Sequence, residues 1–513
     1  MSNTNHKVGI ITFTDDRERI FSQERERYLR SKQDELAELL KENGFIPVDP
    51  LKEIRKSSKG WYGIRFNSEV RQCAQILNQA GIECLIIGTW HWSPPQLVLD
   101  LVNLTNVPLL LVAEDNTDWA GSVFTSAVGA SLLEWGVNRH ALTHERSFLS
   151  DKVSIIKWVR GVCAAKQMRK SAAILWGGSY AVKMELLQDD IPRLKTFLIR
   201  DILSEGQYIL IKRSQEILRQ TPDRINSFIH WLKKNGTRIL YDDKMLNEEI
   251  LRIQLAYVLA ARDRLEELKD EEITGVSIKC QPEIYEEFGV IGCTLPAFLP
   301  FSEDSEGKRP IIPTVCEGDI KGLLTCLLLH KIVPDVPPVF GDLRYICDDF
   351  VVIANCGAAS IYWADNSLSS KEVLPNVTIQ GNNHGRAGGA VGYWGKETEA
   401  TVARLIRIRG KYYMHIGVGK ALDAEKTLKE QLKKKGKLKS YFGLMWPQIV
   451  VNLGVRGDLM FKVAGANHLS MTEGDCSKEL IYACRELAIP VVRIDSNEAI
   501  LGFYETIRDL SRD

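Results

Sequence analysis

Apolar runs and amphipathic segments alternate regularly through the first third of the chain. Four apolar runs, KVGIITF, FIPV, ECLIIGTW and VPLLLVAE, predict strands that start near residues 7, 45, 83 and 107. Between and after them, apolar residues recur at the spacing of an amphipathic helix, over 24–43, 68–80, 97–104 and 122–135. Short strands separated by such helices favour βαβ units, and continuously apolar strands favour a parallel sheet covered on both faces.

A second α/β region is predicted to begin near Asp151. SAAILWGGSYA predicts a strand followed by a Gly-Gly turn, YILIKR predicts another strand, and residues 211–268 are charged and strongly helical. GVSIKC, PIIPTVCEGDI and GLLTCLLLHKI continue the alternation of strands and helices. The proline-rich segment at 333–342 is a candidate boundary.

The last third changes character. Residues 349–420 contain short strand-like runs around a glycine-rich loop, and 426–439 predict a Lys-rich amphipathic helix with a solvated face. At roughly 150 residues per domain, 513 residues predict about three domains. We therefore expect two parallel-sheet α/β domains, 1–152 and 153–335, followed by a β-rich C-terminal domain, 336–513.

Composition narrows the class of protein. Lys plus Arg and Asp plus Glu number 66 each, so the chain has no long-range attraction to nucleic acid or an anionic membrane. The eleven cysteines are scattered and form no C-x-x-C, which disfavours a disulfide framework or a thiolate metal site. No signal-like segment or apolar stretch of membrane-spanning length occurs, so we expect a cytoplasmic protein.

Nucleotide-binding motifs are missing from the sequence. No G-x-G-x-x-G follows the first strand, and no G-x-x-x-x-G-K-[ST] occurs anywhere. The glycine-rich stretch 381–392 follows no βα unit, so its glycines predict a tight or flexible loop. The sequence therefore disfavours a nicotinamide- or ATP-dependent enzyme.

Two carboxylates and one imidazole form the strongest candidate site. Glu317 follows an apolar strand and precedes a helix, and Asp342 ends another apolar run 25 residues on, which suits one strand–helix–strand step. His468, in VAGANHLSM, also lies among strand-like segments. Such ligands suit Mn²⁺ or Mg²⁺ with positions left open for substrate oxygens. Each also has a structural interpretation, since Glu317 or Asp319 could cap the next helix and Asp342 could pair with Arg344.

These segments resemble the L-fucose isomerase family, within the L-fucose/L-arabinose isomerase superfamily. TVCEGDIKGLLTCLLLH with PPVFGDLR resembles the family's central signature, and VAGANHLSMTEGD resembles its G-A-N-H segment. ANCGAAS, GTWHW and ILWGGSYA resemble further segments in the family's order, so the resemblance runs from about residue 8 to about residue 495.

The resemblance implies an aldose–ketose isomerase with an enediol intermediate. Glu317, Asp342 and His468 match the family's ligands of Mn²⁺, with Mg²⁺ or Co²⁺ as alternatives, and the two carboxylates match its proton-transfer groups. We expect the cation to polarise the carbonyl of an open-chain aldose. Glu317 is expected to act as the base and Asp342 as its partner.

Further residues are second-rank candidates for contacts with a sugar. Trp90 matches a family tryptophan that reaches a neighbouring subunit's site, although a core or interface position explains it equally well. The others are Arg17, Gln281, His384, Tyr393, Trp446 and Asn467. The resemblance also implies a homo-oligomer, specifically a hexamer, with no nucleic-acid or membrane partner.

The loops that select the sugar depart from the family pattern. The chain is shorter, the segment between Asp342 and Asn355 is compressed, and a glycine–tyrosine turn is altered to AGGAVGYW, which contains Tyr393. We expect an L-fucose- or D-arabinose-like substrate, with a C6-modified anionic hexose such as sulfoquinovose as the alternative. A non-catalytic sugar-binding protein and a metal lyase or epimerase that uses the same enediolate are the rival classes.

Overall fold

The computed structural model describes residues 6–55, 60–115, 118–135, 144–242, 244–356, 358–382, 385–435 and 446–510. Contacts divide the chain into two compact units. The first unit contains 1–166 with 481–488, and the second contains 167–480 with 489–513. None of the described helices is both long and apolar enough to cross a membrane.

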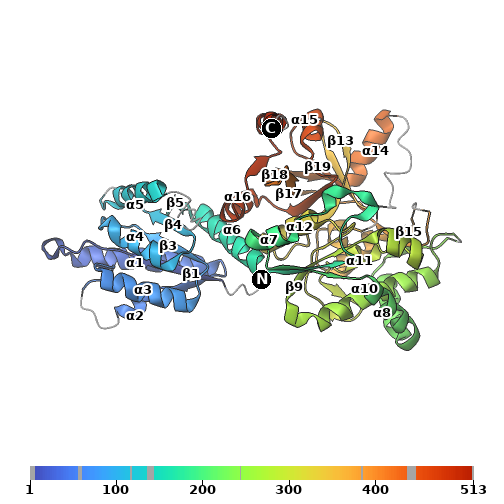
Figure 1. Cartoon of the computed structure of the whole chain (residues 1–513), viewed down its shortest axis with the longest axis horizontal. Helices are drawn as coiled ribbons and strands as arrows, with labels where there is room; N and C mark the ends of the chain where they lie inside the picture. The colour runs from blue at the N-terminus through green and yellow to red at the C-terminus, as the bar shows by residue number, and fades with distance from the viewer. Residues whose placement is uncertain are drawn as a thin grey trace. The chain divides into compact units, whose positions relative to one another are not determined.

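The first unit is a parallel sheet with helices, as the sequence predicts (Figure 1). Its strands lie in the order β2-β1-β3-β4-β5. They are β1 (Lys7–Thr12), β2 (Ile46–Val48), β3 (Cys84–Gly88), β4 (Leu109–Ala113) and β5 (His144–Phe148). The helices are α1 (Gln23–Glu42), α2 (Pro50–Ile54), α3 (Asn67–Ala80), α4 (Pro95–Thr105), α5 (Gly121–Trp135) and α6 (Lys152–Lys170).

Local signals set the ends of these helices. The Ser22 side chain accepts a hydrogen bond from the amide of Arg25 at the start of α1, and Gly81 ends α3 in the left-handed conformation. Strands β3 and β4 are buried along their whole length, which explains their unbroken apolar sequence.

The second unit begins with another parallel sheet, in the order β12-β9-β6-β7. Its strands are β6 (Ala172–Trp176), β7 (Asp201–Glu205), β9 (Ile273–Ile278) and β12 (Thr314–Val315). Its main helices are α7 (Ile191–Phe197), α8 (Tyr208–Gln220), α9 (Pro222–Lys234), α10 (Glu248–Glu267), α11 (Thr294–Phe298) and α12 (Ile320–Ile332).

The strand predicted for YILIKR is wrong, because these residues begin helix α8. The buried residues of α8 are Leu210, Ser214 and Ile217, which lie at i, i+4 and i+7. Of the apolar run 208–211 only Leu210 is buried, and Tyr208 is 72% exposed, so the run crosses several faces of a helix whose period becomes clear only over three turns.

The second unit also contains a β-rich region. Its strands lie in the order β17-β20-β13-β14-β19-β18-β21, and β17 also pairs with β18, which closes six of them into a barrel. They are β13 (Val339–Ile346), β14 (Val351–Ala354), β17 (Thr398–Ile408), β18 (Lys411–Leu422), β19 (Gln448–Asn452), β20 (His468–Glu473) and β21 (Val491–Arg493). A smaller sheet joins β8 (Arg238–Leu240), β15 (Thr378–Gly381) and β16 (Gly389–Gly392).

Helices of the C-terminal third accompany this region. They are α13 (Ser370–Val373), α14 (Ala424–Lys435), α15 (Gly457–Val463) and α17 (Asn497–Leu510), whereas α16 (Ser477–Glu486) is divided between the units, since residues 481–486 belong to the first. The predicted fold class, parallel α/β followed by a β-rich part, is confirmed. The predicted division into domains 1–152, 153–335 and 336–513 stays a prediction.

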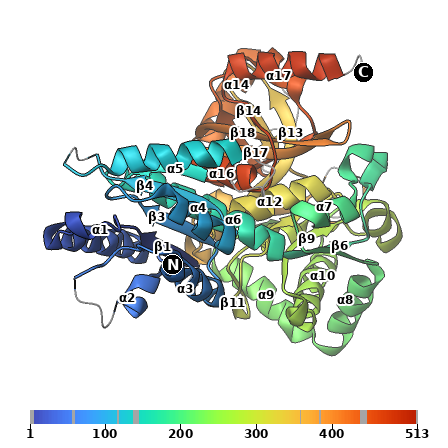
Figure 2. The ribbon, with the colours of Figure 1, turned by 60° about the vertical axis from the view of Figure 1, so that its left-hand side comes forward.

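Helix α12 positions the candidate site because it lies between the parallel sheet and the barrel. It contacts β9 and β12 on one side and β13, β17 and β20 on the other (Figure 2). Ten successive residues, 320–329, are buried, which accounts for the apolar sequence on every face of this helix.

Candidate active site

Glu317 lies on a tight turn between β12 and α12. Glu317 and Gly318 both adopt the left-handed backbone conformation, with φ of 63° and 66°. The amide of Gly318 donates to the carbonyl of Ile278 over 2.9 Å, and a Cβ at position 318 would lie 2.6 Å from the carbonyl oxygen of Gly178. A left-handed glutamate costs on the order of 1–3 kcal/mol, and such strain is typical of functional positions.

Asp342 and His468 face each other across two strands of the barrel. They are paired residues in the antiparallel ladder of β13 and β20, so their side chains project from the same face. The expectation that Asp342 lies at the carboxyl end of a strand beside that of Glu317 is wrong, because β13 continues to Ile346 and belongs to the barrel rather than to the sheet of β12. The two carboxylates converge because α12 returns the chain across both sheets.

The predicted triad comes together at this junction. Nε2 of His468 lies 3.2 Å from Oε2 of Glu317 and 3.5 Å from Oδ1 of Asp342. Nδ2 of Asn467 donates to Oδ1 of Asp342 over 3.3 Å and lies 3.1 Å from Nε2 of His468. The His468 side chain is 2% exposed, Glu317 17% and Asp342 31%, so the site opens to solvent beside Asp342.

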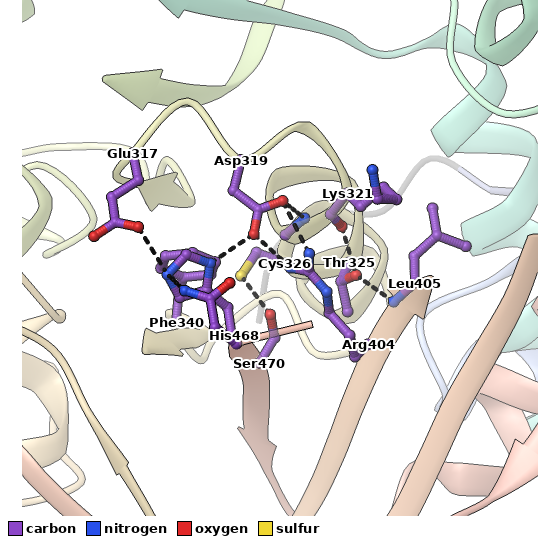
Figure 3. A network of polar contacts seen from close by, with 12 residues as sticks. Glu317, Asp319, Lys321, Thr325, Cys326, Phe340, Arg404, Leu405, His468 and Ser470 are labelled. Carbon is purple, nitrogen blue, oxygen red and sulfur yellow. Dashed lines mark hydrogen bonds and ion pairs between the residues drawn. The ribbon is translucent and has the colours of Figure 1, made fainter. Parts of the chain in front are cut away.

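A buried carboxylate supports the other side of the imidazole. Oδ2 of Asp319 lies 2.8 Å from Nδ1 of His468, and Arg404 donates to both oxygens of Asp319 over 2.7 and 3.1 Å (Figure 3). Asp319 also caps α12 by accepting from the amide of Gly322, as one structural interpretation of the sequence expected. Burial raises the pKa of Asp319, but Arg404 and His468 outweigh burial and hold that pKa well below its ordinary value.

Burial and neighbouring charges shift the pKa values of His468 and Asp342. Burial lowers the pKa of His468, but the carboxylates of Asp319 and Glu317 outweigh it and raise that pKa to about 9. Burial, opposed by His468 and reinforced by Glu317, raises the pKa of Asp342 to about 6. A carboxyl group that titrates this close to neutral pH can both donate and accept a proton.

The donor set fits a divalent cation. Because Asp319 is ionised and can only accept, Nδ1 of a neutral His468 carries the proton and leaves the lone pair of Nε2 toward Glu317 and Asp342. Oδ1 of Asn467 is buried without a hydrogen-bond partner among the described residues, and the buried Oε2 of Glu317 contacts only Nε2 of His468 there. Two carboxylates and an imidazole suit Mn²⁺ or Mg²⁺.

The three ligands are not yet arranged around one point. Among the described residues, donor atoms of Glu317, Asp342 and His468 do not all lie within 4.8 Å of one another. Binding by all three therefore requires a carboxylate to turn, and Asp342, the most exposed, has the most room to do so.

Cys316, the residue before Glu317, carries a buried thiol group. Cys316 lies 3.8 Å from Oδ1 of Asn355, whose Nδ2 donates to the carbonyl of Phe340 over 3.1 Å. The contact with Cys356 and burial raise the pKa of Cys316 well above its ordinary value. The thiol is therefore protonated and packs beside the site without acting as a nucleophile.

The remaining candidates of the second unit lie in varied settings. Trp446 is buried beneath the guanidinium of Arg344, 4.7 Å from its ring centre. Tyr393 is fully buried and donates its hydroxyl proton to the carbonyl of Ser360, so its placement does not support a contact with sugar. Gln281 is half-buried and lines a small cavity with Cys280, Tyr285, Ile291, Gly292, Cys293 and Cys356.

Three candidates lie elsewhere. Arg17 is exposed and pairs with Asp15, and Trp90 is 1% exposed with its Nε1 3.4 Å from Oε1 of Gln33. Both belong to the first unit, and their role in binding sugar stays a prediction. His384 lies outside the described residues.

A cavity of about 550 Å³ opens at the carboxyl ends of β6 and β7. Its lining includes Gly177 and Gly178, and the turn of Gly318 packs against Gly178. Three glutamates, Glu205, Glu283 and Glu287, also line it. The cavity therefore offers hydrogen-bond acceptors at the carboxyl ends of the strands, the end of the sheet where Glu317 also lies.

Sequence reasoning missed Asp319 as the partner of His468 and missed Arg404. The sequence presents Asp319 as a helix cap, and Arg404 as one charge in a strand-like run. A single arginine within the apolar run TVARLI is a usable signal, because a charge buried in a strand requires a partner.

Comparisons with known proteins give consistent matches. A model of the L-fucose isomerase first N-terminal domain matches residues 5–170, and a model of the L-fucose isomerase C-terminal domain matches 353–495. Sulfoquinovose isomerases from Priestia aryabhattai and Priestia megaterium are each 27% identical over 161 residues, which cover 31% of this chain and 32% of theirs. Another from Alkalicoccus urumqiensis is 22% identical over 234 residues, covering 45% of this chain and 46% of its own. The matched segments thus span a third to a half of these relatives.

Proposed function

Because the chain belongs to the L-fucose isomerase family, we propose that it is a metal-dependent aldose–ketose isomerase that acts on an open-chain sugar through an enediol intermediate. The observation that carries this proposal is the convergence of Glu317, Asp342 and His468, with Asp319 and Arg404 behind the imidazole. A sugar-binding protein without catalysis has no need for this set of donors.

The two carboxylates divide the proton transfers. Glu317 removes the proton from C2 of the aldose, the electron pair forms the C1–C2 double bond, and O1 receives a proton from Asp342. Asp342 then takes the hydroxyl proton of O2, and Glu317 returns a proton to C1 to give the ketose. A divalent cation held by Glu317, Asp342 and His468 supplies electrostatic stabilisation of the negative charge that develops on the substrate oxygens.

Asp319 acts through His468. Its hydrogen bond with Nδ1 fixes the orientation and tautomer of the imidazole and raises the basicity of Nε2. Arg404 neutralises Asp319, so both charges remain buried as a pair. Asp319 and Arg404 are therefore positioning residues.

The finer properties follow the family resemblance. We propose Mn²⁺ as the cation, with Mg²⁺ or Co²⁺ as substitutes, and a cytoplasmic homo-oligomer, specifically a hexamer. The proposed substrate is an L-fucose- or D-arabinose-like aldose, and glutamates that line the neighbouring cavity suit the hydroxyl groups of a neutral sugar.

A sulfonated hexose is the second candidate substrate. The three relatives described above carry the name sulfoquinovose isomerase. Arg344 lies on β13 two residues after Asp342 and is exposed, so its guanidinium could contact an anionic group at C6. The Arg344→Gln variant distinguishes the two substrates, because it should raise KM only for the sulfonated sugar.

The direct test is an isomerase assay in D₂O with added Mn²⁺. The panel contains L-fucose, D-arabinose, L-arabinose, L-rhamnose and a C6-sulfonated glucose. We expect one of them to yield a ketose with deuterium at C1, only when the cation is present, and Glu317→Gln to abolish it. Formation of an epimer would move the protein to the epimerase class, and full activity of Glu317→Gln would refute the site.

A further inference from the structure

Three side chains of types that can bind a metal ion meet at the amino end of the sheet in the first unit. His6 immediately precedes β1, Glu83 immediately precedes β3, and Cys163 lies in α6. The register of β1 against β3 sets the first two side by side, since the amide of Glu83 donates to the carbonyl of Lys7 over 2.8 Å. Nδ1 of His6 then lies 2.6 Å from Oε2 of Glu83.

These residues form a compact donor set. One ligand atom each from His6, Glu83 and Cys163 lie within 4.8 Å of one another, which no other trio of His, Cys, Asp or Glu does in the described part of the chain. The side chains of His6 and Glu83 are 10% and 13% exposed, and Cys163 is 2% exposed. Imidazole, carboxylate and thiol are the three ligand types of protein zinc sites.

We propose that His6, Glu83 and Cys163 bind a Zn²⁺ ion that has a structural role. Binding replaces the thiol proton of Cys163, which leaves to solvent, and the neutral imidazole of His6 coordinates through Nδ1. The charges of Zn²⁺, the Glu83 carboxylate and the Cys163 thiolate then sum to zero, which is what a buried site requires. A water molecule completes the coordination.

The ligand chemistry separates this site from the proposed catalytic one. A thiolate favours Zn²⁺ over Mn²⁺ or Mg²⁺, whereas Glu317, Asp342 and His468 offer oxygen and one nitrogen but no sulfur. Without metal, contacts with Cys84, burial and Glu83 raise the pKa of Cys163 well above its ordinary value, so the thiol is not a reactive nucleophile.

The position of the site favours structure over catalysis. Ligand sites of parallel α/β sheets lie at the carboxyl ends of the strands, and this cluster lies at their amino ends. The cation would join α6 to two neighbouring strands. Its ligands are far apart in the sequence, since 77 positions separate His6 from Glu83 and Cys163 lies farther along the chain. Its binding energy would therefore stabilise the first unit.

Zinc binding to the full-length protein tests this inference. The protein is stripped with a chelator, dialysed against Zn²⁺ without Mn²⁺, and its metal content is measured. We expect one tightly held Zn²⁺ per chain that Cys163→Ala and Glu83→Gln lose, in addition to any Zn²⁺ that Glu317, Asp342 and His468 hold. The control Cys73→Ala removes another buried thiol of the first unit, in α3, and should retain the ion.

Two further measurements keep the result independent of folding defects and of the proposed function. X-ray absorption of the wild-type zinc protein should show a sulfur ligand at about 2.3 Å and nitrogen or oxygen at about 2.0–2.2 Å. The variant Glu317→Gln should hold this zinc while losing isomerase activity. Zinc spectra without sulfur, or equal zinc content in Cys163→Ala and wild type, would overturn the proposal.

Discussion

His468 and Asp319 are joined by a buried contact of 2.8 Å between Nδ1 and Oδ2. Because Arg404 neutralises Asp319 from the other side, the contact orients the imidazole and leaves Nε2 directed at Glu317 and Asp342. A ligand histidine supported by a carboxylate is more basic and better ordered than one that faces water. The metal affinity of the site should therefore depend on a residue that does not bind the metal.

Asp319→Asn should weaken metal binding and stability together. The amide preserves shape but can present its NH₂ group to Nδ1, which favours the wrong tautomer, and we expect an affinity for Mn²⁺ lower by about 10- to 100-fold. Arg404 is left buried beside a neutral group, so the free energy of unfolding should fall by about 3–5 kcal/mol. Titration with Mn²⁺ and urea denaturation measure the two effects.

Asp189→Asn is the matched control for this variant. Asp189 is another fully buried carboxylate, and it pairs with Lys321 and Arg407 at 3.0 Å each. Its loss should lower stability and leave Mn²⁺ affinity unchanged. Equal loss of affinity in both variants would show that Asp319 contributes only through folding.

Gly318→Ala should displace Glu317. A Cβ at this position would lie 2.6 Å from both the carbonyl oxygen of Gly178 and Cα of Ser179, so the turn must move. A shift of about 1 Å in a catalytic group can cost on the order of 10²-fold in rate, and we expect at least that loss in kcat.

Gly178→Ala separates this clash from the cost of the left-handed backbone. Gly178 has φ of 77°, and a Cβ there would meet nothing within 4 Å. Alanine should cost about 1–2 kcal/mol of stability and leave kcat near the wild-type value. If both variants lose activity equally, the close approach of Gly318 to Gly178 is not what positions Glu317.

The sequence predicts the first unit better than the second for a physical reason. Strands such as β3 and β4 are buried on both faces, so each is a continuous apolar run that local pattern reveals. The strand predicted for YILIKR fails because three apolar residues in succession fit the start of α8 equally well. Only the later buried position, Ile217, distinguishes the two.

The same limit of local sequence pattern applies to the candidate site. Glu317 is predictable from the sequence because it lies where a strand ends, which is a relation within one short segment. The pairing of Asp319 with His468 joins residues 149 positions apart and depends on how β20 is placed beside β13. No local pattern contains that information, so the metal-supporting role of Asp319 emerges only from the folded chain.

Glu317→Gln and Asp342→Asn should impair different proton transfers. Removing the base at Glu317 should lower kcat by about 10³- to 10⁴-fold and suppress deuterium exchange at the sugar carbon. Asp342→Asn should slow ketose formation more than it slows exchange, since Glu317 can still remove the C2 proton. Both rates are measured by NMR in D₂O at Mn²⁺ concentrations that saturate each variant, and equal suppression of both processes by Asp342→Asn would contradict the division of roles.

His415 should make the second unit sensitive to acid. It lies on β18, is 1% exposed, and burial together with the charge of Arg404 lowers its pKa to about 4 from 6.5. The unfolded chain therefore binds more protons than the folded chain between these pH values. Stability is complete above pH 6.5 and falls as pH decreases toward 4, by about 3 kcal/mol for this single group.

His415→Gln removes this titration and tests its size. The difference in unfolding free energy between pH 7 and pH 4.5, from urea denaturation, should be smaller in the variant than in the wild type by about 2–3 kcal/mol. His230→Gln is the control, because His230 lies exposed on α9 and its substitution should leave the difference unchanged. If His415→Gln keeps the wild-type pH dependence, the imidazole of His415 either is protonated in the folded state or reaches solvent before the unit unfolds. In both cases the folded chain would bind the proton as readily as the unfolded chain.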